Sequence, residues 1–76
     1  QSGGNMPLSI APSGAVVVIR KVDAEEKVRR HLQELGIAQG ERVTVLSSDG
    51  GNVILQVKEG RLCLDGTLAA RITVSV

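Results

Sequence analysis

The chain contains no phenylalanine, tyrosine or tryptophan among its 76 residues. Branched aliphatic side chains must therefore fill the core, and the chain supplies eleven valines, eight leucines and five isoleucines. Valine and isoleucine fit the pleated surface of a sheet well. The missing rings also exclude a groove for proline-rich peptides and argue against base-stacking recognition of single-stranded nucleic acid. The composition thus predicts a small, sheet-rich domain.

Charge and cysteine content narrow the function classes further. The formal net charge is +1, so no strong field attracts the chain to DNA or to an anionic membrane. A single cysteine can form neither an internal disulfide nor a multi-thiolate zinc site, which fits a reducing compartment. The longest apolar run, residues 15–19, is strand-sized and falls short of the ~20 residues that a membrane span needs.

Two segments precede the first expected strand. We interpret residues 1–5 as a cloning remnant and Met6 as the natural start, so that the domain covers residues 6–76. Residues 7–14 hold two prolines and one glycine, which indicates an extended lead-in with a turn. Leu8 could anchor this lead-in across the fold.

Residues 23–36 carry the signals of one α-helix. Asp23 can cap its start, and Glu26 follows at the spacing of a capping box. Gly36 can adopt the left-handed conformation that ends a helix. Helical spacing predicts one inward apolar stripe, made of Val28, Leu32 and Leu35.

Alternating apolar residues predict a series of short strands. Asp49-Gly50-Gly51 marks one hairpin turn, and Asp65 can cap a single helical turn before the last strand. On that last strand, Ile72, Val74 and Val76 are expected to share the inner face. The expected strands are residues 15–22, 41–47, 53–58, 61–64 and 72–76. We therefore predict a mostly β fold, a small five-stranded barrel with one α-helix inserted after the first strand.

The order of several short motifs is more specific than any one of them. The domain opens with Leu8-x-x-Ala11-Pro12-x-Gly14, and Arg29-Arg30-His31-Leu32-x-x-Leu35-Gly36-Ile37-x-x-Gly40 follows the first strand. The later pieces are Val43-x-Val45, Gly51-Asn52-Val53-Ile54-Leu55-Gln56-Val57, Leu62-Cys63-Leu64 and Ala69-Ala70-Arg71-Ile72-x-Val74. Together they resemble the FeoA family, ferrous iron transport protein A, over residues 7–74.

The resemblance implies an SH3-like barrel and a non-catalytic, cytoplasmic accessory protein. Its implied partner is the cytosolic part of FeoB, a ferrous iron transporter of the membrane with a GTP-binding domain. A related barrel stands at the C-terminus of iron-dependent repressors, so a metal-responsive regulatory module is the alternative. One departure concerns Cys63, where the family often has a small residue such as alanine; this suggests a packed thiol that conserves size.

The chain offers little for catalysis, metal binding or nucleic-acid binding. His31 and Cys63 form the only base and nucleophile pair, and the sequence indicates no third group to orient them. His31 and Glu34 could share a helix face, but two ligands make a weak metal site. Acidic residues in the same helical turns reduce the positive potential of the basic residues, which weakens any attraction to nucleic acid. We therefore expect no enzymatic activity, no cofactor and no nucleic-acid partner.

Surplus apolar residues suggest a partner surface instead. In a small barrel only one face of most strands points inward, so Leu46 and Ile54 should face outward. Exposed apolar residues can mark a partner site, although they can equally cover the helix or the lead-in. We also expect Ile37, which follows the helix stop, to be exposed. The same outer face could support weak self-association. The predicted partner-binding residues are Arg30, Leu35, Gly36, Ile37, Leu46 and Ile54.

Overall fold

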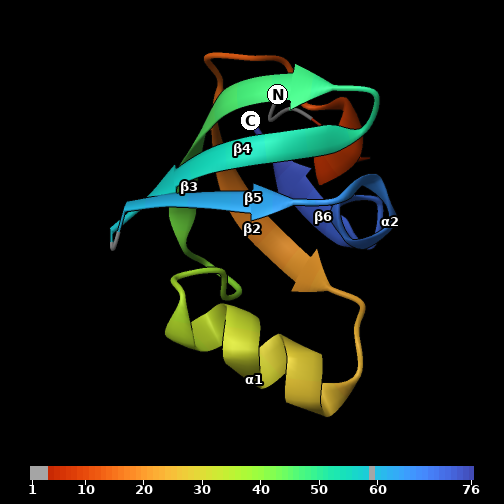
Figure 1. Ribbon diagram of the computed structural model, residues 1–76, viewed down its shortest axis with the longest axis vertical. Coiled ribbons are helices and arrows are strands. Elements are labelled where there is room, and N and C mark those ends of the chain that lie inside the picture. Colours follow the sequence, from red (N-terminus) through yellow and green to blue (C-terminus); the bar gives the residue numbers. More distant parts are fainter. Residues whose placement is uncertain (1–3, 59) are drawn as a thin grey trace.

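A computed structural model describes residues 4–58 and 60–76. Within them a six-stranded antiparallel sheet has the order β1-β6-β2-β3-β4-β5 and curls around one core (Figure 1). The prediction of a mostly β, SH3-like fold is confirmed, but the five-stranded barrel is wrong in strand number and closure, because β1 and β5 remain sheet edges. The elements are β1 Asn5–Pro7, the 3-10 helix η1 Leu8–Ile10, β2 Val16–Val22, α1 Glu26–Glu34, β3 Arg42–Asp49, β4 Asn52–Val57, β5 Gly60–Leu64, α2 Gly66–Ala69 and β6 Ile72–Ser75.

The sixth strand is β1, which the sequence suggested only as an extended lead-in. It pairs with β6 over three residues, from Asn5 opposite Ser75 to Pro7 opposite Thr73. A three-residue strand that ends in proline carries no alternation from which it could be predicted. Leu8 follows it and is fully buried, so the expected anchoring of the lead-in is confirmed. Asn5 belongs to the sheet although we assigned it to the cloning remnant.

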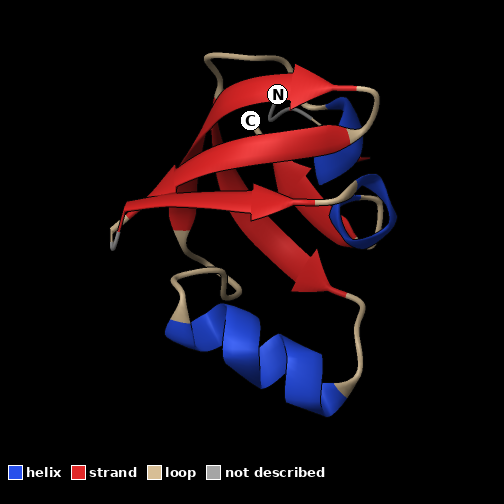
Figure 2. Cartoon of the chain, in the orientation of Figure 1, coloured by secondary structure: helices blue, strands red, loops and turns tan. Residues whose placement is uncertain are grey.

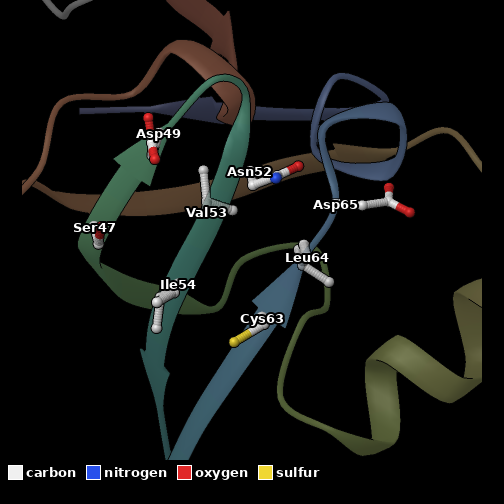
Figure 3. Close-up of a pocket in the computed structure, with 8 residues that line it drawn as sticks. All are labelled: Ser47, Asp49, Asn52, Val53, Ile54, Cys63, Leu64 and Asp65. Carbon is white, nitrogen blue, oxygen red and sulfur yellow. The ribbon is translucent and has the colours of Figure 1, made fainter.

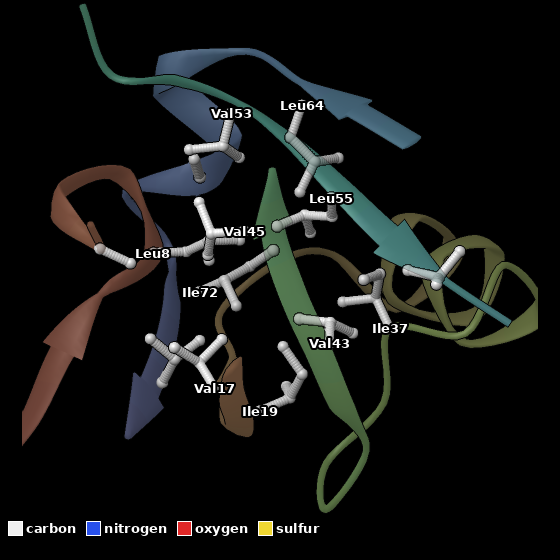
Figure 4. Close-up of a cluster of buried hydrophobic side chains, with 14 of the residues drawn as sticks. Leu8, Val17, Ile19, Ile37, Val43, Val45, Val53, Leu55, Leu64 and Ile72 are labelled. Atoms are coloured by element: carbon white, nitrogen blue, oxygen red, sulfur yellow. The ribbon is translucent and has the colours of Figure 1, made fainter. Parts of the chain in front are cut away.

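The core consists of aliphatic side chains from the inner faces of five strands and from the connecting segments (Figure 4). The alternation predicted for β3 and β4 is confirmed, because their inward residues are buried. The last strand is shorter than expected: β6 ends at Ser75, and Val76 beyond it is 66% exposed. Fully buried members with large side chains are Leu8, Val17, Ile19, Ile37, Val45, Val53, Leu55, Ile72 and Val74.

The N-cap of helix α1 lies two residues later than predicted. It is Glu25, whose side chain makes no capping hydrogen bond, so the capping box from Asp23 is wrong. Asp23 is occupied elsewhere: its backbone N–H donates to the Arg71 carbonyl at 2.9 Å. This bond extends the pairing of β2 with β6, and it holds the chain extended where the helix was expected to start.

The C-terminal end of α1 is closed by two backbone hydrogen bonds around a left-handed glycine. Gly36 has φ +102° and donates to the Gln33 carbonyl at 3.1 Å, while the Ile37 N–H donates to the Leu32 carbonyl at 2.8 Å. This Schellman arrangement brings the residue after the glycine against the last turn of the helix. Ile37 is therefore fully buried, and the expectation that it is exposed is wrong.

The short helix α2 has the predicted cap. The Leu68 N–H donates to Asp65 Oδ1 at 2.8 Å, and Ala69 is fully buried beneath it. The start of α2 also packs tightly against the turn between β3 and β4. A Cβ at Gly66 would lie 3.4 Å from the Gly51 carbonyl carbon, and the Gly66 N–H donates to Asn52 Oδ1 at 2.7 Å. These contacts fix one end of β4.

Candidate partner-binding surfaces

The outer face of β3, β4 and β5 carries a row of small and apolar side chains. Ser47 is opposite Ile54, and Ile54 is opposite Cys63, so the three lie side by side across the strands (Figure 3). Leu46 is the extra residue where the register of β3 against β4 shifts, next to Ser47, and it is 38% exposed. We call Leu46, Ile54 and Cys63 the outer strip. Its exposed aliphatic area is the kind of surface that partner proteins cover.

A hollow of about 640 Å³ lies over this part of the sheet. Two carboxylates, Asp49 and Asp65, stand near one end of it, and Ile54 and Cys63 lie towards the other (Figure 3). The hollow therefore combines an apolar floor with an acidic rim, which suits a partner segment with both aliphatic and basic side chains. Its lining residues are Ser47, Asp49, Asn52, Val53, Ile54, Cys63, Leu64 and Asp65.

Helix α1 offers a second, chemically different surface. It lies at one end of the molecule's longest axis, beyond the sheet (Figure 2). Leu32 is its one buried residue. Arg30 pairs with Glu26 one turn earlier, with Nη2 and Oε2 3.3 Å apart, and both side chains are exposed. The exposed face mixes both signs of charge, so it presents no continuous basic or acidic field.

The six residues predicted to bind a partner do not form one patch. Leu46 and Ile54 share the outer strip, although Ile54 is half-buried. Leu35 and Gly36 are half-buried at the end of α1, where a Cβ on Gly36 would lie 3.5 Å from Val57 Cβ. Arg30 is on the exposed face of α1, and Ile37 is in the core. The outer strip is thus the part of the prediction that forms a surface.

Within the part of the chain that the structure describes, no side-chain hydrogen bond or ion pair involves His31 or Cys63. His31 is exposed on α1 and Cys63 is exposed on β5, which contradicts the packed thiol expected from the sequence. Odd-numbered residues of β5 face outward. The size of the residue at position 63 is therefore constrained by the outer face of the sheet and not by packing in the core. Across the described residues, no group of three or more histidine, cysteine or carboxylate side chains is placed to hold a metal ion.

Besides Val76, the valines Val28 and Val16 are exposed, which the sequence did not predict. Val28 is 36% exposed, although helical spacing put it in the inward stripe of α1. Because α1 projects beyond the sheet, only Leu32 reaches the core. Val16 is 51% exposed on the outer face of β2, where the continuous apolar run hid the alternation. A sequence pattern cannot identify either exposure, since both depend on what the tertiary fold leaves uncovered.

The fold and these surfaces define a small SH3-like β domain with a projecting helix and an uncovered apolar strip. Within residues 4–58 and 60–76, no helix has the length and apolar character required to cross a membrane. A model of the FeoA domain family matches residues 6–76. The chain belongs to the FeoA domain family, as the resemblance indicated.

Individual proteins agree with this assignment. A curated relative from Methanocaldococcus jannaschii, named "Putative Fe(2+) transport protein A", is 31% identical over 90% of this chain and 83% of its own length. A crystal structure of an "Iron Uptake Regulatory Protein (FeoA)" superposes with a TM-score of 0.84 at 25% identity, covering 95% of this chain and 97% of that one. A "Manganese-dependent transcriptional repressor" shares the fold, with a TM-score of 0.81 at 19% identity over 99% of this chain and 43% of that one.

Proposed function

We propose that this protein is a non-catalytic accessory of ferrous iron uptake. It acts in the cytoplasm, by binding the cytosolic part of a FeoB-type transporter. Membership of the FeoA family and a relative named for Fe(2+) transport support this proposal. The outer strip supports binding as the mode of action, because it leaves aliphatic side chains uncovered on a domain with a very small core.

The proposed mechanism is a shift in the transporter's equilibrium between states. An accessory protein changes such an equilibrium only if it binds one state more tightly than another. The nucleotide held by the transporter's GTP-binding domain defines two candidate states. The proposal therefore requires the affinity of this chain for that domain to depend on the nucleotide.

The outer strip carries the proposed contact. Leu46 is itself the extra residue at the irregularity in β3, and its side chain is exposed. Ile54 is opposite Ser47, the residue next to Leu46. Its side chain is half-buried and therefore already ordered, so a partner that covers the exposed part loses little conformational entropy. The carboxylates Asp49 and Asp65 at the rim would orient a basic side chain of the partner.

An amide NMR titration tests the proposal. The isotope-labelled chain is titrated with the transporter's cytosolic GTP-binding domain, with and without a GTP analogue, and separately with ferrous iron alone. We expect shifts that cluster around Leu46 and Ile54 and that differ between the nucleotide conditions. Shifts around His31 with iron alone, and none with the protein domain, would favour the metal-responsive module instead.

Matched variants locate the contact. Leu46→Asp should weaken binding by more than ~1 kcal/mol, because it places a charge in an apolar contact. Val28→Asp is the control: it makes the same chemical change at an aliphatic residue of similar exposure, on α1 instead of the outer strip. Full affinity in a folded Leu46→Asp variant, with weakened binding in Val28→Asp, would move the contact to the helix.

The repressor fold similarity does not carry a second function. At 19% identity it shows the fold alone. The alternative of a metal-responsive module therefore has no specific support among the described residues, and the iron-only titration remains its direct test.

A further inference from the structure

Strand β5 is an uncovered edge of the sheet. It pairs with β4 along one side, and it is the last strand in the sheet order, so its other side meets no strand among residues 4–58 and 60–76. An edge strand presents a row of backbone N–H and C=O groups that can pair with another chain. What distinguishes this edge is the order of its side chains.

The side chains of β5 alternate between the two faces of the sheet. Arg61 and Cys63 are exposed on the outer face, while Leu62 is half-buried and Leu64 is buried on the inner face. Asp65 continues the pattern, because it is exposed and its backbone is extended, with φ −75° and ψ 166°. The five residues thus read outer, inner, outer, inner, outer.

We propose that β5 pairs antiparallel with β5 of a second copy of this chain, around a two-fold axis at Cys63. In that register Cys63 is opposite Cys63 of the second copy. Arg61 is opposite Asp65 of the second copy, and this ion pair occurs twice. Leu62 is opposite Leu64 of the second copy on the inner side, again twice. Each pair brings together opposite charges or two apolar side chains, which are the favourable cross-strand combinations.

Other registers lose this match. A shift of one residue would set an outer residue of one copy against an inner residue of the other, which the two-fold pairing of like faces forbids. A shift of two residues centred on Leu62 places Arg61 opposite Cys63 and removes both ion pairs. The charged residues therefore favour one register and one orientation of one partner, a second copy of the same strand.

The carboxylate of Asp65 can cap α2 and also pair with Arg61 of the second copy. Its Oδ1 accepts the hydrogen bond that caps α2, from the Leu68 N–H at 2.8 Å. A carboxylate has two oxygens and can accept from several donors, so Oδ2 is available to an arginine across the interface. Capping also fixes the side chain in place, which lowers the entropy lost when the ion pair forms.

The contact is small. Two five-residue strands bury far less than the ~1,200 Å² of a standard stable interface, so we expect a weak dimer that forms at high concentration. The dimer would join two sheets edge to edge and set two outer strips side by side, because Ile54 is the neighbour of Cys63 on β4. Weak pairing of this kind responds to salt, since its specificity lies in exposed ion pairs.

Disulfide trapping reads this register directly. The chain has one cysteine, so a covalent dimer can form only between two Cys63 side chains. Opposed residues of an antiparallel pair have Cα atoms about 4.5–5.5 Å apart, within the range of a disulfide. The full chain is oxidised with diamide and the dimer is followed on a non-reducing gel. We expect the rate to fall about tenfold in Arg61→Asp, where like charges would oppose each other.

Two further variants distinguish disulfide formation in this register from disulfide formation by random collision. Arg42→Asp makes the same change at an exposed arginine of β3, away from β5, and should leave the rate unchanged. Arg61→Asp combined with Asp65→Arg restores opposite charges across the interface and should restore the rate. Equal rates in the wild type, Arg61→Asp and Arg42→Asp would overturn the proposal.

A non-covalent measurement covers the case in which the double variant fails to fold. Sedimentation equilibrium of Cys63→Ser, with interference optics because the chain has no aromatic residue, should show a dimer that dissociates as salt is raised. A monomer up to about 1 mM at low salt would also overturn the proposal, because it would leave the edge without self-affinity.

Discussion

The two helices of this domain are stabilised in opposite ways. Helix α2 has four residues, a side-chain cap from Asp65 and a fully buried Ala69, and its first residue packs against the β3–β4 turn. Helix α1 has nine residues, no side-chain cap and one buried side chain, Leu32. The shorter helix belongs to the core, while the longer one is anchored to the core near its C-terminal end.

This difference shows which parts of a helix the fold requires and which parts can vary in sequence. Isolated helices of nine residues are marginal in water, so α1 needs its tertiary anchor despite its favourable composition. The anchor is the closing turn, where Leu32 and Ile37 enter the core around Gly36. The rest of α1 can change without disturbing the packing. Contacts with other proteins are therefore less constrained there than on α2.

The largest effect should come from removing the anchor of α1. Leu32→Ala should lower the free energy of unfolding by ~2–5 kcal/mol, the usual cost of truncating a buried leucine. Urea unfolding followed by far-ultraviolet circular dichroism measures it. Val28→Ala, one turn earlier on the same helix and 36% exposed, should cost well under ~1 kcal/mol. Similar losses in the two variants would mean that both sides of α1 are packed.

A smaller effect is expected at the closing glycine. Gly36→Val should cost ~1–3 kcal/mol, because a β-branched residue is strained at φ +102°. Gly36→Asn should cost less, since asparagine tolerates the left-handed region better. The two variants are compared by thermal unfolding. If asparagine and valine destabilise equally, then crowding against Val57 dominates over backbone strain.

The smallest effect concerns the cap of α2. Asp65→Ala should cost about 1 kcal/mol, which for a domain of this size lowers the melting temperature by roughly 4–8 °C. Asp65→Asn keeps an oxygen that accepts from the Leu68 N–H, so its melting temperature should stay close to that of the wild type. A loss of the same size in both variants would show that the charge of Asp65 matters more than the cap.

Local signals predicted the features that depend on near neighbours. The alternation of β3 and β4, the stop at Gly36 and the cap at Asp65 each need only a few adjacent residues. The strand β1 was missed because three residues ending in proline carry no period. Ile37 was misplaced because its burial follows from the contact that completes a Schellman turn, which a glycine stop alone does not reveal.

The candidate surface was predictable only in part. Strand alternation correctly placed Leu46 and Ile54 outward, but not the register shift that makes Leu46 prominent. Arg30 and the end of α1 were grouped with them because the sequence gives no distances between elements. The charge order of β5 was readable throughout, but it gains meaning only once β5 is known to be an edge.

The pairing of β1 with β6 also determines how another protein could carry this domain. Asn5 and Ser75 are opposite each other, so the two ends of the described chain leave from neighbouring positions, away from α1 along the long axis (Figure 1). A few added residues would suffice to join them, which permits circular permutation or insertion into a host loop. In either arrangement the tether would leave α1 and the β5 edge uncovered.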